Sequence, residues 1–97
     1  MVDKLDTEQR RIIGNEARQL LENRHLKEAF EAVEEYLDQA ALGCDPDNKD
    51  KAARIIISKQ LLAAIKREIE RKIEDGEIAN IEISELERKK GLLRFIR

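Results

Sequence analysis

The stretch DPDNKDKAARIIISKQLLAAIKREIERKIEDG, residues 45–76, decides the fold that we expect. Asp45 can cap the free amides at a helix start, Pro46 suits the first helical position, and Gly76 suits the left-handed residue just past a helix end. The stretch therefore predicts one helix over residues 46–75, about 45 Å long if straight. Its apolar residues recur at helical spacing and form one stripe, which comprises Ala52, Ile55, Leu62, Ile65, Ile69 and Ile73. A rod of this length needs a second helix or a second subunit to cover that stripe.

The residues before this stretch predict a first helical arm over residues 7–42, after a frayed segment over residues 1–6. Asp6 with Gln9 offers a capping pair at the start of this arm. Its two apolar sets are out of phase, so we expect a kink or break near Asn23, with Asn23 capping the second piece. The sets are Ile13, Ala17, Leu20 and Leu21, and then Leu26, Phe30, Val33, Leu37 and Ala40.

The short turn Gly43-Cys44-Asp45 can send the second arm back antiparallel to the first. We therefore expect a single all-α domain over residues 1–97, an antiparallel helical hairpin with a kinked first arm. Residues 77–83 fit either an extended segment or a loop. Ser84 with Glu87 forms a capping box, which predicts a short C-terminal helix or tail over residues 84–97.

Composition narrows the possible functions. Charged residues make up 41% of the chain, well above the usual quarter, as expected for long helices with solvated flanks. Aromatic residues make up 3%, which leaves little material for a ligand pocket walled by rings. A net charge of -2 argues against a general polyanion binder. Since neither a secretory signal nor a bilayer-spanning apolar run is apparent, we expect no membrane partner and a cytosolic or particle-bound location.

No residue pattern announces a reaction. His25, the single histidine, has no evident orienting partner or nucleophile, and Cys44, the single cysteine, excludes an intramolecular disulfide. Asp45, Asp47 and Asp50 lack the spacing of a calcium loop and are better interpreted as acids in the first turn of a helix. We therefore expect no enzymatic activity, no metal site and no cofactor.

Three surfaces are candidates for partner contact. The stripe residues Ile55, Leu62, Ile65, Ile69 and Ile73 would hold the hairpin or an oligomer together. An acidic stripe on the first arm is either a solvated face or a docking face for a basic partner, and it comprises Glu28, Glu31, Glu35 and Asp38. The C-terminal bases Arg88, Lys89, Lys90, Arg94 and Arg97 could contact phosphates. Their apolar neighbours would either anchor a partner or fold back onto the hairpin, and these are Leu92, Leu93, Phe95 and Ile96.

The run Leu20-Leu21-Glu22-Asn23, followed by Leu26-Lys27-Glu28-Ala29-Phe30-Glu31-Ala32, resembles a pattern found in small helical proteins of tailed bacteriophages. Glu74-Asp75-Gly76 is similar to the acidic-glycine turn that follows the second long helix in those proteins. The resemblance implies a phage-encoded protein from the region of the head-assembly and DNA-packaging genes, found in the host cytoplasm or the virion. It carries over no catalytic residue.

The expected function is therefore a non-enzymatic interaction or assembly protein, with a protein partner and self-association. Two alternatives belong to other classes. One is a small packaging subunit that binds DNA through the basic C-terminal residues, although a nucleic-acid partner is not favoured. The other is an acidic inhibitor of a host nucleic-acid enzyme, which would act through the acidic stripe.

Overall fold

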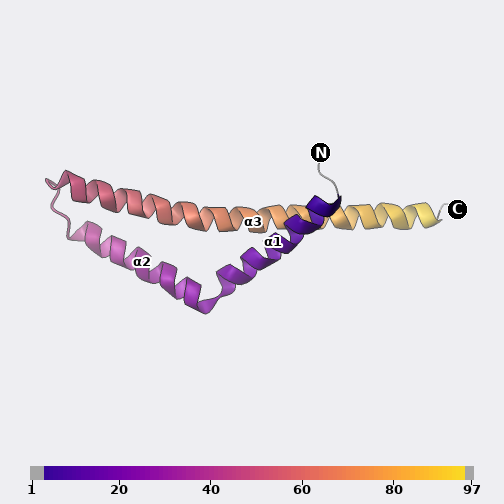
Figure 1. The fold of residues 1–97 in the computed structure, drawn as a ribbon, viewed down its shortest axis with the longest axis horizontal. Coiled ribbons are helices and arrows are strands. Elements are labelled where there is room, and N and C mark those ends of the chain that lie inside the picture. Colours follow the sequence, from indigo (N-terminus) through magenta and orange to yellow (C-terminus); the bar gives the residue numbers. More distant parts are fainter. Residues whose placement is uncertain (1–3, 96–97) are drawn as a thin grey trace. The chain divides into compact units, whose positions relative to one another are not determined.

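The computed structural model describes the backbone of residues 4–95 and the side chains of residues 6–92. Within this range the chain is all-α, as predicted, with three helices and no strand (Figure 1). The helices are α1 (Lys4–Glu22), α2 (Arg24–Leu42) and α3 (Lys49–Phe95). Helix α1 begins at Lys4, three residues before the predicted start at Thr7. Thr7 is a buried residue inside the helix.

Helix α1 ends at Glu22 and α2 begins at Arg24, so Asn23 lies between the two helices. Asn23 has an extended backbone, with φ -65° and ψ 121°, and its side-chain oxygen accepts a hydrogen bond from the amide of Leu26 at 3.1 Å. This is the geometry of a helix N-cap, which satisfies one of the free amides at the start of α2. Helix α2 ends at Leu42 with Gly43 as its C-cap, as predicted, and the Gly43 amide donates to the carbonyl oxygen of Gln39 at 3.0 Å.

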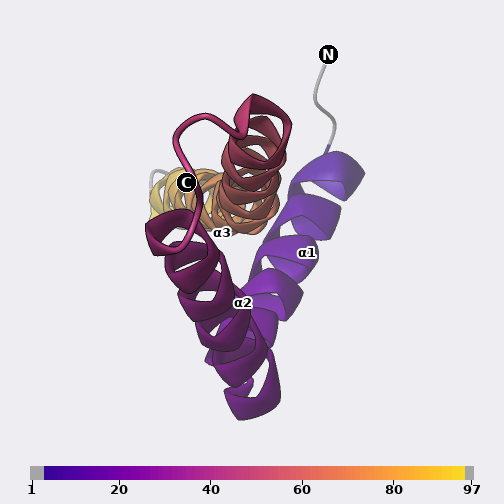
Figure 2. The ribbon, with the colours of Figure 1, turned by 90° about the vertical axis from the view of Figure 1, so that its left-hand side faces the viewer.

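The start of α3 differs from the prediction. Asp45 and Pro46 lie in a turn that is closed by a 3.0 Å hydrogen bond from the Asp47 amide to the Asp45 side chain and a 2.9 Å bond from the Asn48 amide to the Asp45 carbonyl. The helix begins at Lys49, with the Asn48 side chain accepting from the Lys51 amide at 3.2 Å. Asn48 is thus the helix cap. Pro46 lies in the turn before it, because proline suits the second position of a β-turn as well as the first position of a helix. Figure 2 shows this connection between the end of α2 and the start of α3.

The predicted end of the helix at Gly76 is wrong. Helix α3 continues through Gly76, through residues 77–83, where an extended segment or loop was expected, and through Gly91 to Phe95. The expected separate C-terminal helix is therefore part of α3. No glycine among the described residues has a positive φ, so Gly76 does not serve as a helix stop. Its role is a close contact with α1.

The chain divides into two compact units, and α3 contributes to both. Unit 1 contains the chain up to Gln19 and from Glu70 onward, and unit 2 spans Leu20–Ile69. Among the side chains described in unit 1, the buried residues are small, namely Thr7, Gly14, Ala17, Gly76 and Ala79. In unit 2, Leu37 is the one described large apolar residue that is buried. Both units therefore have thin cores.

Candidate interaction surfaces

In unit 1, α1 and α3 touch at two glycines. A Cβ built on Gly14 would lie 2.7 Å from the Gly76 Cα, and a Cβ built on Gly76 would lie 2.7 Å from the Gly14 Cα. Real Cβ atoms essentially never come this close to a backbone carbon. The two helices therefore pack backbone to backbone here, which only glycine permits on both sides. Gly14 was not among the predicted contact residues, although an isolated glycine inside a helical pattern often marks such an approach.

Ion pairs flank this contact. The Arg10 guanidinium meets the Asp75 carboxylate with Nη2 to Oδ1 at 2.9 Å and Nε to Oδ2 at 3.0 Å, and its Nη1 reaches Glu82 at 3.2 Å. These hydrogen bonds, above all those with Asp75, raise the pKa of Arg10 against the opposing effect of desolvation. Arg18 forms a second pair with Glu77 at 2.7 Å. The Arg10 and Arg18 pairs align α1 on α3 around the glycines.

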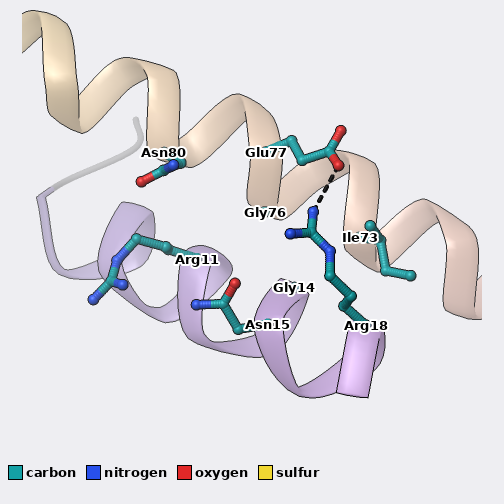
Figure 3. A pocket seen from close by; sticks show the side chains of 8 residues that line it. All are labelled: Arg11, Gly14, Asn15, Arg18, Ile73, Gly76, Glu77 and Asn80. Atoms are coloured by element: carbon teal, nitrogen blue, oxygen red, sulfur yellow. Dashed lines mark hydrogen bonds and ion pairs between the residues drawn. The ribbon is translucent and has the colours of Figure 1, made fainter. Parts of the chain in front are cut away.

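A shallow hollow of about 170 Å³ lies beside the glycine contact (Figure 3). Its two cations are paired with carboxylates, Arg18 with Glu77 inside the hollow and Arg11 with Glu8 at 3.0 Å. The polar groups that remain are the amides of Asn15 and Asn80. With its positive charge neutralised in this way, the hollow does not favour a phosphate or another anion.

In unit 2, two lysines of α3 pair with acids of α2. Lys59 Nζ lies 2.8 Å from Asp38 Oδ1, and Lys66 Nζ lies 2.8 Å from Glu34 Oε1. Lys66 Nζ also lies 5.9 Å from the centroid of the Phe30 ring, within the range of a cation–π contact. Lys66, the later lysine in the sequence, pairs with Glu34, the earlier acid. This part of α2 therefore runs antiparallel to α3.

A set of large apolar side chains lies on the side of the α2–α3 pair away from these two ion pairs. On α2, a turn of about 100° per residue places Val33 and Tyr36 on the opposite flank of the buried Leu37 from the two paired acids. On α3, the same count places Leu61 and Ile65 on the opposite flank from the two paired lysines. We call this set the apolar strip; it comprises Val33, Tyr36, Ile57, Leu61 and Ile65, which are between 45% and 73% exposed.

The predicted contact stripe of α3 is thus divided between two environments. Four of its members are half-buried and belong to the inner face of the helix, and these are Ile55, Leu62, Ile69 and Ile73. Ile65, which was predicted with them, is exposed. Ile57 and Leu61, which were not part of the predicted stripe, lie with Ile65 on the exposed flank. Ile57, Leu61 and Ile65 follow one another at four-residue spacing, and this spacing was the sequence signal that they share one face of the helix.

The predicted acidic face is partly engaged within the chain. Asp38 pairs with Lys59, and Glu28 pairs with Arg24 at 2.9 Å. Glu31 and Glu35 are exposed. The structure therefore does not bring the four acids together as one uniform surface.

The described C-terminal part of α3 is exposed. Every residue from 84 to 92 is exposed, including the predicted phosphate contacts Arg88, Lys89 and Lys90 and the predicted anchor Leu92. In Figure 1 this part of α3 continues beyond the start of α1. The predicted contacts Leu93, Arg94 and Phe95 have side chains outside the described residues, and Ile96 and Arg97 lie outside them entirely.

Other candidate chemistry is sparse. His25 is exposed, and Cys44 is half-buried with its sulfur 3.5 Å from the Asp45 carbonyl oxygen. Among the side chains that the structure describes, no group of three or more His, Cys, Asp or Glu residues could hold a metal ion. Over the same part of the chain, no helix is long and apolar enough to span a bilayer.

Comparison of the chain with protein-family models, with curated proteins and with solved structures finds no match.

Proposed function

We propose that this chain is a non-enzymatic assembly or adaptor protein that acts through protein–protein contact. The observation that carries the proposal is the apolar strip. Its five side chains leave roughly 500 Å² of mostly apolar surface in water, which is at the upper end of what a monomeric protein exposes in one patch. The opposite side of the same helix pair is bridged by ion pairs, so the two sides differ in chemistry. A helix pair with one such apolar side suits a partner on that side.

The free energy available from this surface is considerable. Burying the exposed half of an isoleucine or leucine side chain gains about 1 kcal/mol, and α3 alone supplies three such residues. Unit 2 gains little elsewhere, since Leu37 is its one large buried apolar residue among those described. Covering the strip would therefore stabilise the fold as well as the complex. In this proposal the whole chain folds as an antiparallel hairpin whose first arm is kinked at Asn23.

The proposed setting is a bacteriophage particle or its DNA-packaging apparatus, with the protein in the host cytoplasm or the virion. Support comes from the resemblance of residues 20–32 to small helical phage proteins. A small helical protein with an uncovered apolar side is suited to joining larger subunits during assembly.

A DNA-binding packaging subunit is the second candidate, favoured by the exposed bases Arg88, Lys89 and Lys90. It predicts DNA binding that weakens steeply with salt, because phosphate contacts release counterions. Neutralising these three bases together with Arg94 and Arg97 should then abolish binding. If binding is absent from the native protein, or is unchanged in the variant, this second candidate fails. An inhibitor acting through the acidic stripe has less support, because Glu28 and Asp38 are paired within the chain.

A matched pair of substitutions tests the assembly proposal. Ile56 and Ile57 are neighbours on α3 and are 55% and 54% exposed, but Ile57 lies in the strip and Ile56 is turned about 100° away from its neighbour. Ile57→Glu should lower the mass measured by light scattering across a concentration series, and Ile56→Glu should not. Circular dichroism verifies that both variants remain helical. The proposal fails if both variants have the mass of the native protein at every concentration.

A further inference from the structure

One exposed face of α3 has a symmetric sequence. Outward from Leu61, an isoleucine stands four residues away on each side, and a charged residue stands three residues beyond each isoleucine. At about 100° per residue, all four positions lie within about 40° of Leu61 around the helix. The face comprises Arg54, Ile57, Leu61, Ile65 and Glu68, and all five residues are exposed. The spacing is the same in both directions, but the two end charges are opposite.

This pattern is complementary to itself in only one orientation. If a second copy of α3 lies antiparallel with Leu61 facing Leu61, Ile57 of each copy faces Ile65 of the other. Arg54 of each copy then faces Glu68 of the other, which places opposite charges at both ends of the contact. A parallel arrangement would place arginine against arginine and glutamate against glutamate, which is unfavourable.

We infer that a second copy of this chain docks antiparallel along this face, with a two-fold axis at Leu61. The inference rests on the proposed assembly function and names the partner that covers the apolar strip. A two-fold contact uses the same patch on both copies and closes at two subunits. The strip supplies roughly 500 Å² of the ~800 Å² that each partner contributes to a standard interface, and the flanking Arg54 and Glu68 extend it. The area and the charges therefore both fit a dimer.

Cysteine cross-linking tests the orientation. In a Cys44→Ser background, Leu61→Cys should form a disulfide with its own copy on oxidation, because facing residues on helices 8–10 Å apart bring their Cα atoms to about 5 Å. Ile57→Cys should not link to itself, since its two copies would be about 12 Å apart along the helix axis. The same holds for Ile65→Cys. An equimolar mixture of the Ile57→Cys and Ile65→Cys proteins should link as a heterodimer.

Each cross-linking result decides the inference. Linking of Leu61→Cys alone, and of the other two only when mixed, supports it. Self-linking of all three variants indicates parallel packing and overturns it, as does a dimer in which none of them links. In both of those cases the protein still associates, so the assembly proposal stands. A native chain that remains monomeric at every concentration overturns both the inference and the assembly proposal, because the Ile57→Glu test also requires self-association.

Charge exchange provides an independent test. Arg54→Glu should weaken dimerisation about tenfold at low salt, because both end contacts become repulsive. Glu68→Arg should weaken it similarly. The two single variants mixed together should associate as a heterodimer with native affinity, because each opposite-charge contact is restored between unlike copies. The double variant should also recover. Failure of both the mixture and the double variant to recover would overturn the antiparallel assignment.

Discussion

The glycine contact between α1 and α3 yields a prediction whose sign depends on the structure. Glycine in a helix interior costs about 1 kcal/mol relative to alanine, so Gly76→Ala would stabilise an isolated helix by this amount. In the folded protein the new methyl group would lie 2.7 Å from the Gly14 Cα and 3.2 Å from the Arg10 carbonyl oxygen. Both are backbone atoms, which cannot rotate away. Overpacking of this kind costs about 3 kcal/mol at the upper end, so we expect a net loss of about 2 kcal/mol.

Gly91 provides the matched control on the same helix. A Cβ on Gly91 would meet nothing within 4 Å, so Gly91→Ala should raise the free energy of unfolding by about 0.5 kcal/mol through helix propensity alone. Thermal unfolding followed by circular dichroism, at one fixed protein concentration, measures both variants. Gly76→Ala should lower the midpoint by about 10 °C, and Gly91→Ala should raise it by a few degrees. A rise in both variants would refute the close contact of α1 and α3 at Gly76.

The remaining predictions concern the Asn23 cap and two ion pairs. Asn23→Ala should lower the free energy of unfolding by about 1 kcal/mol in urea titrations, and Asn23→Ser should recover most of the loss, because serine also caps α2. Arg10→Lys should lower the thermal midpoint, since lysine cannot form the two parallel hydrogen bonds to Asp75, and the loss should shrink in high salt. The hydrogen bonds that raise the pKa of Arg10 stabilise the fold as long as the guanidinium is charged. This stability is lost only as the pH rises through that pKa, which is far above neutral. Arg10 should therefore add no pH dependence across the neutral range. Lys59→Ala should cost at most about 1 kcal/mol, because its pair with Asp38 is exposed; a larger loss would imply a tighter contact than the structure has.

Local signals were sufficient where a boundary is decided by neighbouring residues. The all-α class followed from helical spacing, the break at Asn23 from the phase change around it, and the helix end at Gly43 from glycine. The start of α3 was misplaced because Asp45 and Asn48 are both good caps, and Pro46 fits a turn as well as a first helical turn. Only the hydrogen bonds of the folded turn distinguish these alternatives.

The continuation of α3 beyond Gly76 could not be predicted locally. A glycine after an acidic turn is typical of a helix end, and the same residue is required where two helices touch. The difference lies in Gly14, which is distant in the sequence and faces Gly76 only in the fold. The apolar strip was missed for a related reason. Helical spacing shows where the apolar residues of α3 lie around the helix, but the fold determines which of them are covered, and Leu62 is half-buried while Leu61 is exposed.

Because both cores are thin, the apolar strip matters for the stability of the fold as well as for partner contact. The glycine contact in unit 1 brings backbones together and buries little apolar side-chain area, and unit 2 buries Leu37 as its one large apolar residue among those described. A small chain with so little internal burial commonly gains stability from a further element such as oligomerisation. The face centred on Leu61 would supply that burial in an antiparallel dimer. Folding and self-association would then depend on the same residues, so the surface proposed for assembly would also be the missing part of the core.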